Sequence, residues 1–346
     1  MHSRIVSRTF SCVLVVVLMT MRVSLAAPAD KSWTFSLYFE NDLFADSDQH
    51  YTNGIKLSWI SPDLTRYRDS GKLPAWSQPY IDLLPFIHEP GLQRNITLSV
   101  GQNIYTPQDI SRKDLIRDDR PYAGWLYFGA AFHNKNPRRL DSMEVQLGLV
   151  GPLSFAEQAQ TLVHELRGFA KPEGWSHQLK TEPGIALVYE RKWRTVLPPR
   201  HGLGFDLISH AGGALGNIQT YANAGLEARI GWNLPADFGN SLIRPGGDTN
   251  APVDASDPRR RRHGFGFHLF ASVDGRAVAR DIFLDGNTFA SSHRVDKRNL
   301  VADLAAGASL IAGRFKLSFA KVLRTREFRG QAANHRFGSV TLSYTY

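Results

Sequence analysis

Residues 339–346 read Ser-Val-Thr-Leu-Ser-Tyr-Thr-Tyr, so polar and apolar side chains alternate without a break. Alternation with a period of two is the pattern of a β-strand that has one polar and one apolar face. The same pattern recurs along the chain, for example at residues 143–149 and 226–232. It predicts about twelve strands, which lie near residues 33–43, 51–61, 95–105, 121–134, 138–150, 183–195, 202–213, 218–233, 263–276, 297–310, 312–325 and 335–346.

The side to which the apolar residues turn distinguishes two all-β architectures. A soluble β-sandwich buries them, whereas a transmembrane antiparallel β-barrel turns them towards lipid and lines its interior with polar residues. Here the polar positions carry side chains such as Glu144, Gln146 and Arg229, and aromatic residues gather near strand ends. These features and an even strand number favour an all-β transmembrane barrel of about 12 strands. The soluble β-sandwich is the alternative.

The two ends of the chain indicate where such a barrel resides. Residues 1–27 combine basic side chains, a short apolar run and small residues, which is typical of a removed secretory signal peptide. The rest, residues 28–346, is expected to be a single domain without cysteine, because Cys12 lies in the signal. The last strand ends on Tyr346, which resembles the final strand of bacterial outer-membrane proteins. We therefore expect an integral outer-membrane protein that acts as a monomer.

Three segments depart from the strand pattern. Residues 154–169 carry apolar side chains near helical spacing and predict a short helix in a loop. The long segments 62–94 and 235–262 would lie on the periplasmic side, where turns are normally short. Four consecutive arginines at 259–262 contribute to a formal net charge of +9. In an exported protein this run indicates contact with anionic membrane lipids, and we expect no nucleic-acid partner.

The loops that follow the first, third and fifth predicted strands meet at one rim of the barrel. A carboxylate with neighbouring oxygens can bind calcium, and a neutral imidazole can take a proton from water. Two adjacent cations can bind a phosphate. Together these groups could hydrolyse an acyl ester in an anionic lipid, although each is also common in ordinary loops. The candidate residues are Asn41, Asp42, Thr52, Arg112, Lys113 and His164.

The same loops contain motifs that occur in order along most of the chain. They are Asn41-Asp42, Tyr-Thr-Asn-Gly at 51–54, Gln-Asn-Ile-Tyr-Thr-Pro at 102–107, Asp-Arg-Pro-Tyr-Ala-Gly-Trp at 119–125, Gly-Pro at 151–152, and His164 followed by Trp175. This set resembles the outer-membrane lipid A 3'-O-deacylases. The resemblance implies a twelve-stranded barrel with a calcium-dependent site that releases the 3'-linked acyloxyacyl group of lipid A from lipopolysaccharide.

By matching positions, the resemblance also implies roles for single residues. Asn41, Asp42 and Thr52 match active-site positions, Asp42 matches a metal ligand, and His164 matches the base that activates water.

Two features of the match differ from the family. Arg112 and Lys113 match a basic substrate-binding pair, but in reversed order. Ala170 stands six residues after the histidine, where the family has a catalytic glutamate, and Glu165 or Glu173 could take that role.

Two other functions stay open on the sequence alone. One is an outer-membrane phospholipase that uses a Ser-His site. The other is a non-catalytic barrel that acts as a pore or binds lipid, and Ala170 is its best support.

Overall fold

The computed structural model describes residues 32–42, 50–64, 78–82, 84, 89–200, 202–239 and 242–346. The predicted signal peptide, residues 1–27, lies outside the described residues.

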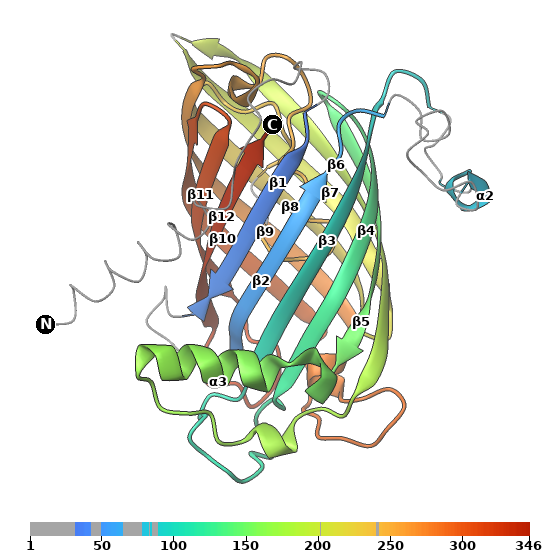
Figure 1. The fold of residues 1–346 in the computed structure, drawn as a ribbon, viewed down its shortest axis with the longest axis vertical. Coiled ribbons are helices and arrows are strands. Elements are labelled where there is room, and N and C mark those ends of the chain that lie inside the picture. Colours follow the sequence, from blue (N-terminus) through green and yellow to red (C-terminus); the bar gives the residue numbers. More distant parts are fainter. Residues whose placement is uncertain are drawn as a thin grey trace, which may run out of the picture.

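Twelve antiparallel strands of the described chain form one closed barrel (Figure 1). Each strand pairs with its sequence neighbours, and β1 closes the ring against β12, where Phe35 lies opposite Tyr344. The predicted fold class and strand number are confirmed. The strands are β1 (Thr34–Asn41), β2 (His50–Ile60), β3 (Gln93–Thr106), β4 (Ala123–Asn136), β5 (Arg139–Val150), β6 (Glu182–Arg200), β7 (Leu203–Gly216), β8 (Gln219–Trp232), β9 (Phe265–Asp281), β10 (Leu300–Ala312), β11 (Phe315–Arg324) and β12 (His335–Thr345).

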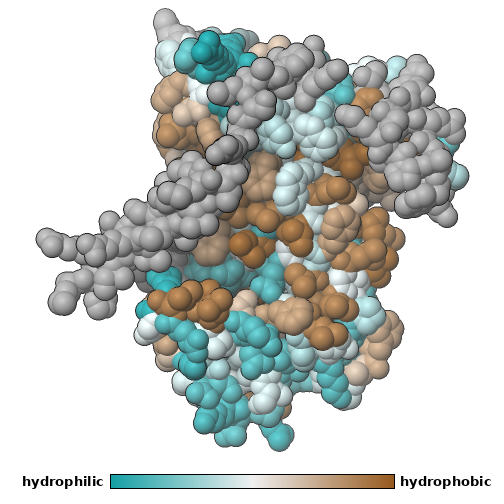
Figure 2. Space-filling model, in the orientation of Figure 1, coloured by the Kyte–Doolittle hydropathy of each residue, from teal (hydrophilic) through white to brown (hydrophobic). Residues whose placement is uncertain are grey.

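Side chains of each strand alternate between the lumen and the outer wall. In β5, Glu144 and Gln146 are buried inside the barrel, whereas Leu147 has 52% of its surface exposed. On the face shown in Figure 2, hydrophobic side chains cover the middle of the wall and mainly hydrophilic ones cover the end that carries α3. An exposed apolar belt of this kind suits lipid and would be costly in water, which rules out the soluble sandwich.

The helices all lie in connections between strands. The predicted loop helix is confirmed as α3, and a 3₁₀ turn, η5, precedes it. Among the described residues, no helix is both long and apolar enough to cross a membrane. The helical segments are α2 (Gln78–Ile81), η5 (Pro152–Ser154), α3 (Ala156–Arg167), η6 (Trp175–His177), η7 (Pro258–Arg260) and α4 (Ile282–Asp285).

The described part of the connection between β8 and β9, residues 233–239 and 242–264, folds into the lumen, and we call it the plug. Its Asp248 pairs with Lys56 of β2 at 2.6 Å, and its Arg244 pairs with Glu190 of β6 at 2.6 Å. The segment therefore contacts separate parts of the wall. The expectation that residues 235–262 lie in the periplasm is wrong, because their charges find partners on the polar inner wall.

One carboxylate, Asp237, joins the plug to the wall. It accepts hydrogen bonds from Arg229 of β8, Lys316 of β11 and Arg259 of the plug itself, at 2.5, 2.8 and 2.8 Å. The side chains of Asp237, Arg229 and Arg259 have no exposed surface. The expected contact of the 259–262 run with anionic lipid is thus wrong for Arg259, whose charge is neutralised inside the barrel.

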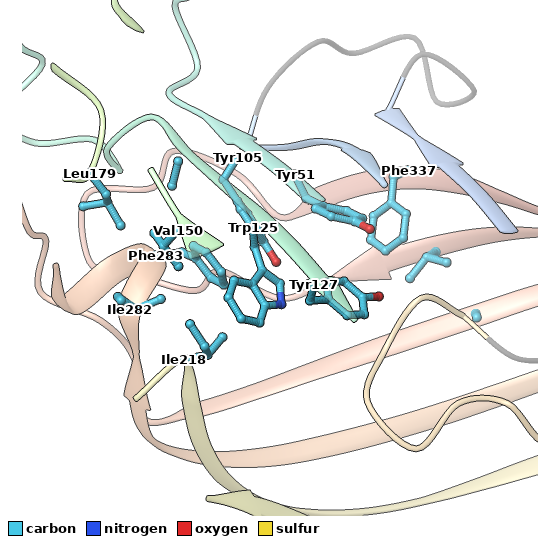
Figure 3. Packing of buried hydrophobic residues seen from close by; sticks show 13 residues of the cluster. Tyr51, Tyr105, Trp125, Tyr127, Val150, Leu179, Ile218, Ile282, Phe283 and Phe337 are labelled. Carbon is cyan, nitrogen blue, oxygen red and sulfur yellow. The ribbon is translucent and has the colours of Figure 1, made fainter. Parts of the chain in front are cut away.

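Aromatic side chains close the lumen at the opposite end (Figure 3). Phe283 of α4 stacks on Tyr105 with ring centroids 4.1 Å apart, and Trp125 stacks on Tyr127 at 5.7 Å. Ile282 beside Phe283 has no exposed surface. This aromatic cluster and the plug fill the barrel from its two ends.

Candidate active site at the outer rim

Helix α3 lies across the outside of the barrel wall, near the ends of β2, β3 and β4 (Figure 1). The Gln102 side chain of β3 donates a hydrogen bond to the carbonyl oxygen of Ser154 at 2.6 Å. A Cβ on Gly124 of β4 would lie 2.0 Å from Ser154 Oγ and 2.3 Å from Ala156 Cβ. The start of α3 therefore rests directly on the backbone of β4, and only glycine at position 124 allows this contact.

Helix α3 buries polar side chains and exposes apolar ones, which is the reverse of a helix on the surface of a soluble protein. Its buried residues are Ala156, Gln160 and His164, which recur every four positions and face the barrel. Leu162 and Leu166 on the other face are 56% and 78% exposed. A helix with an outward apolar face beside a membrane barrel is suited to the interface between lipid headgroups and acyl chains.

We predict that Gly124→Val displaces α3 and leaves the barrel folded. The added side chain collides with Ser154 and Ala156, which belong to a connection rather than to the sheet. Since small displacements of reacting groups are costly, activity should fall about 100-fold. The measurement is hydrolysis of the acyl ester expected from the sequence, alongside the heat-dependent mobility on gels that reports barrel folding. Gly168→Ala is not a suitable control, because Gly168 has a positive φ of 69°. Gln158→Val, at an exposed position of α3, tests instead whether any β-branched substitution in this region has the effect. Full activity of Gly124→Val would contradict the prediction.

The end of α3 fixes the orientation of the His164 ring. Gly168 adopts a left-handed conformation, and the amide of Phe169 donates to the carbonyl oxygen of His164 at 2.9 Å. The chain turns back here, which brings the carbonyl oxygen of Ala170 within 2.7 Å of His164 Nδ1. Because a carbonyl only accepts hydrogen bonds, Nδ1 must carry the proton. In the neutral ring the basic lone pair is then on Nε2.

Trp175 of η6 holds the middle of the helix. Its indole Nε1 donates to Gln160 Oε1 at 2.9 Å, and its ring packs against Tyr122 with centroids 4.9 Å apart. The Tyr122 hydroxyl donates to the carbonyl oxygen of Ile110 at 3.2 Å. The loop after β3 and the loop after β5 are thereby joined beneath α3.

Asn41 and Asp42 lie where β1 ends, at the same rim as α3. Pairing places Asn41 opposite Asn53 of β2, Asn53 opposite Ile104 of β3, and Ile104 opposite Gly124 of β4. Directly paired residues share one face of a sheet, so this row runs along the outer wall to the contact point of α3. Asn41 and Asp42 are both buried, at 5% and 0% exposure.

The row gives the position of His164 relative to Asn41. His164 is eight residues beyond Ala156, which is about 12 Å along a helix. Three strand spacings separate β4 from β1, which is about 14 Å across a sheet. Figure 1 shows α3 running across the strand ends from β4 towards β1, so the end of the helix that carries His164 is the end nearer to β1.

Thr52 lies at an irregularity in the same strand end. The pairing of β2 with β3 shifts register between Tyr51 and Asn53, so Thr52 is the extra residue of a β-bulge. Bulges re-aim side chains and are frequent beside active sites.

The basic pair lies in the loop after β3, close to the segment that follows α3. Lys113 Nζ is 3.8 Å from a carboxylate oxygen of Glu173, and both side chains are largely exposed. The carbonyl oxygen of Arg112 lies 2.9 Å from where a Cβ on Gly174 would be. Arg112 and Lys113 therefore lie beside the segment that follows α3 rather than on the buried face of the helix.

Neither glutamate that could replace the missing family residue shares the buried face with His164. Glu165 forms a 2.5 Å ion pair with Lys171, and this hydrogen bond raises the pKa of the Lys171 ammonium. Both side chains are about half exposed. Glu173 is engaged with Lys113. The group that contacts the His164 ring at this position is the backbone carbonyl of Ala170.

The oxygen groups at the end of β1 agree in type with a calcium site. Calcium binds carboxylate, amide and backbone oxygens, and Asp42 with Asn41 supplies the first two. In the described part of the chain, no group of three or more His, Cys, Asp or Glu residues could hold a metal ion. A calcium ion here would therefore depend on amide, carbonyl and water oxygens for most of its ligands.

Several supporting residues have no assigned role in the sequence motifs. Gln102 and Trp175 occur in those motifs, but nothing in the sequence shows that they bind the helix. Gln160 could be found, since it lies four residues before His164 and helical spacing puts both on one face. The carbonyl of Ala170 has no sequence signal, because every residue has one.

Comparison with known proteins gives two kinds of match. A family model described as outer membrane protein LpxR matches residues 11–346. Among solved structures, LpxR from Salmonella typhimurium has a TM-score of 0.71 and 16% identity, covering 90% of this chain and 99% of that one. The β domain of the Bordetella autotransporter BrkA has a TM-score of 0.43 and 8% identity, covering 91% and 99%. No curated protein matches in sequence. At 16% identity the structural match shows a shared fold.

Proposed function

Because the chain belongs to the LpxR family of outer-membrane proteins, we propose that it hydrolyses the 3'-linked acyloxyacyl ester of lipid A, with His164 as the base. Membership makes it an integral outer-membrane protein and a lipid A-related enzyme. The observation that carries the proposed mechanism is the hydrogen bond between His164 Nδ1 and the Ala170 carbonyl. It leaves Nε2 as the atom that can accept a proton from water.

The position of α3 supports an ester of a membrane lipid as the substrate. The exposed face of the helix presents Leu162 and Leu166 to acyl chains, whereas the buried face presents His164 to the barrel. The ester bonds of a lipid lie between headgroup and acyl chains, at the depth of an interfacial helix. A lipid that diffuses along the wall can therefore bring such a bond to the space between α3 and the strand ends.

In this mechanism each candidate residue has a distinct role. His164 Nε2 takes a proton from water, and the oxygen attacks the ester carbonyl to form a tetrahedral intermediate. When the intermediate collapses, the ester C–O bond breaks and His164 returns the proton to the leaving alkoxide. Asn41 and Thr52 orient the ester or the water.

Two further groups act on charge rather than on the proton. Arg112 and Lys113 hold a lipid A phosphate at the rim. A calcium ion bound through Asp42 would polarise the ester carbonyl.

The direct test combines lipid A with the purified protein and calcium. We predict release of the 3'-linked acyloxyacyl group as one acyloxyacyl carboxylic acid, detected as the corresponding mass loss of lipid A. Removing calcium with a chelator should stop release, and added calcium should restore it, because Asp42 is the metal ligand. Magnesium at the same concentration is the control, since its demand for octahedral geometry differs. Release that persists in chelator would contradict the calcium role, and no mass loss under any condition would contradict the function.

The phospholipase alternative needs a serine beside the histidine. Ser154, at the start of the helical connection, is buried and donates its hydroxyl to the carbonyl oxygen of Gly151 at 2.6 Å. It precedes α3, whose first residue, Ala156, is already eight residues from His164, or about 12 Å along the helix. Ser154 therefore does not form a Ser-His pair with His164.

The pore alternative makes a different prediction for the intact barrel. The plug and the aromatic cluster fill the lumen from both ends, so we predict no steady ion conductance in planar bilayers. The control is a general porin reconstituted under the same conditions. Long-lived conductance steps from the purified protein would favour the pore.

A further inference from the structure

A hollow of about 770 Å³ opens on the outer wall opposite α3. It is lined by β8, β9 and β10 and by the loops above them. Strand β9 is six positions around the ring from β3, which contacts α3. The hollow is therefore separate from the candidate active site, although both lie at the same end of the barrel. Its size is within the roughly 300–1,000 Å³ of sites that bind small molecules.

The floor of the hollow faces lipid rather than the lumen. Ala222 and Ala224 of β8 are exposed, whereas Asn223 between them is buried and donates to Glu190 inside the barrel at 3.1 Å. Pairing puts Ala222 opposite Ala277 and Ala224 opposite Gly275 on β9. Further along the same outer faces the residues become large, with Ile230 on β8 and Phe267 on β9 about half exposed. Four small residues thus form the floor of the hollow at this end of β8 and β9.

Two arginines stand at the upper edge of the hollow. Arg298 and Arg326 both line the hollow and are exposed. No ion pair in the described part of the chain involves either side chain, whereas the neighbouring Arg324 pairs with Asp303 at 2.8 Å. Leu300 lies just below Arg298 and is 76% exposed. The hollow therefore combines two available guanidinium groups above with an apolar recess below.

We propose that this hollow is a second, non-catalytic binding site for a phosphorylated glycolipid of the lipid A type. Arg298 and Arg326 bind one phosphate through guanidinium hydrogen bonds, and an acyl chain occupies the recess over Gly275. Two observations identify the occupant: the positive charge of Arg298 and Arg326, and the position of the hollow at the outer end of the barrel. There the lipid presents anionic headgroups above acyl chains. The proposal goes beyond the proposed hydrolysis and does not depend on it.

The test counts lipid A molecules that remain on the purified barrel, by native mass spectrometry. The variant Arg298→Ala/Arg326→Ala removes both cations and should weaken retention at this site about 30-fold, from roughly a tenfold change per 1.4 kcal/mol and about 1 kcal/mol per basic residue. Gly275→Leu fills the recess instead. A Cβ there would lie 3.7 Å from its nearest neighbour, the Ala224 carbonyl oxygen, which is an ordinary contact, so the barrel should fold.

The matched control is Arg261→Ala/Arg262→Ala, which removes the same charge from exposed residues at the other end of the barrel. We expect the control to retain as many lipid A molecules as the unmodified protein, and both hollow variants to retain one fewer. After all bound lipid has been removed, diphosphoryl lipid A should rebind at this site in the unmodified protein but in neither hollow variant. Dephosphorylated lipid A should rebind at this site in none of them. Equal counts in all variants, or a phospholipid in place of lipid A, would overturn the proposal.

Fatty-acid release separates this result from the proposed hydrolysis. The hollow variants should release fatty acid at the unmodified rate, because no residue of the hollow belongs to the candidate active site. If the protein releases none, the proposed function fails while the lipid count still decides the second site.

Discussion

His164→Ala should lower fatty-acid release from lipid A by about 10²–10⁴-fold, the usual contribution of a general base. The imidazole lies on the buried face of α3, and a hydrogen bond from Nδ1 to the Ala170 carbonyl sets its orientation. Alanine removes the proton acceptor but keeps helix propensity, so α3 should remain in place. Measured by mass spectrometry of lipid A, the variant should leave the substrate essentially intact.

His177→Ala is the matched control for this prediction. His177 belongs to the neighbouring η6, is exposed, and donates only its backbone amide, to the carbonyl oxygen of Gly174 at 3.0 Å. Its loss should leave the rate within about twofold, as for a surface change away from the site. Equal rates for His164→Ala and the unmodified protein would contradict the assignment of His164 as the base. A similar loss in both variants would indicate damage to the connection rather than to catalysis.

The barrel could be predicted closely from the sequence because its signal is repeated twelve times. Each strand has one face in lipid and the other in a polar lumen, so the two-residue alternation is nearly uninterrupted. The predicted segment 138–150 corresponds to β5 at Arg139–Val150, and 218–233 corresponds to β8 at Gln219–Trp232. The larger errors are at the rims, where β6 continues to Arg200 and β9 to Asp281. There the strands leave the membrane, and the alternation no longer has lipid to select it.

The candidate site could be predicted only as a set of residues on one rim. Strand order alone puts the loops after β1, β3 and β5 together, and the structure places Asn41, Asp42 and His164 there. The docking of α3 on the outer wall could not be predicted, because it depends on Gly124 leaving space for Ser154 and Ala156. In the sequence, a glycine that lets a helix pack directly on a strand cannot be told from a glycine that forms a turn.

The position of the plug inside the lumen could not be predicted, for a related reason. Its residues 235–262 are polar and rich in arginine, as expected of a solvated loop. Their partners Glu190, Lys56 and Lys316 are spread over three distant strands, and each looks like an ordinary lumen residue in its own strand. Complementary charge becomes visible only when the ring closes and brings these strands around one segment.

Asp237→Ala should destabilise the barrel by about 3–5 kcal/mol, as expected when one partner of a buried ion pair is removed. The carboxylate is fully buried and accepts from Arg229, Arg259 and Lys316. Arg229 keeps a second partner, because its Nη2 also donates to Asp206 at 2.6 Å, whereas Lys316 forms no other ion pair with the described residues. The substitution therefore leaves positive charge inside the barrel without enough counter-charge, and the plug should loosen from β11 first.

The matched control is Asp296→Ala, which also breaks an ion pair with an arginine. Asp296 is 3.3 Å from Arg329, but the two side chains are 70% and 79% exposed. An exposed pair of this kind is worth about 0–1 kcal/mol, because water solvates the charges once they separate. Urea unfolding followed by tryptophan fluorescence should therefore shift strongly for Asp237→Ala and little for Asp296→Ala. Equal midpoints for the two variants would mean that water in the lumen already solvates the cations around Asp237, and that the plug is held by its backbone contacts instead.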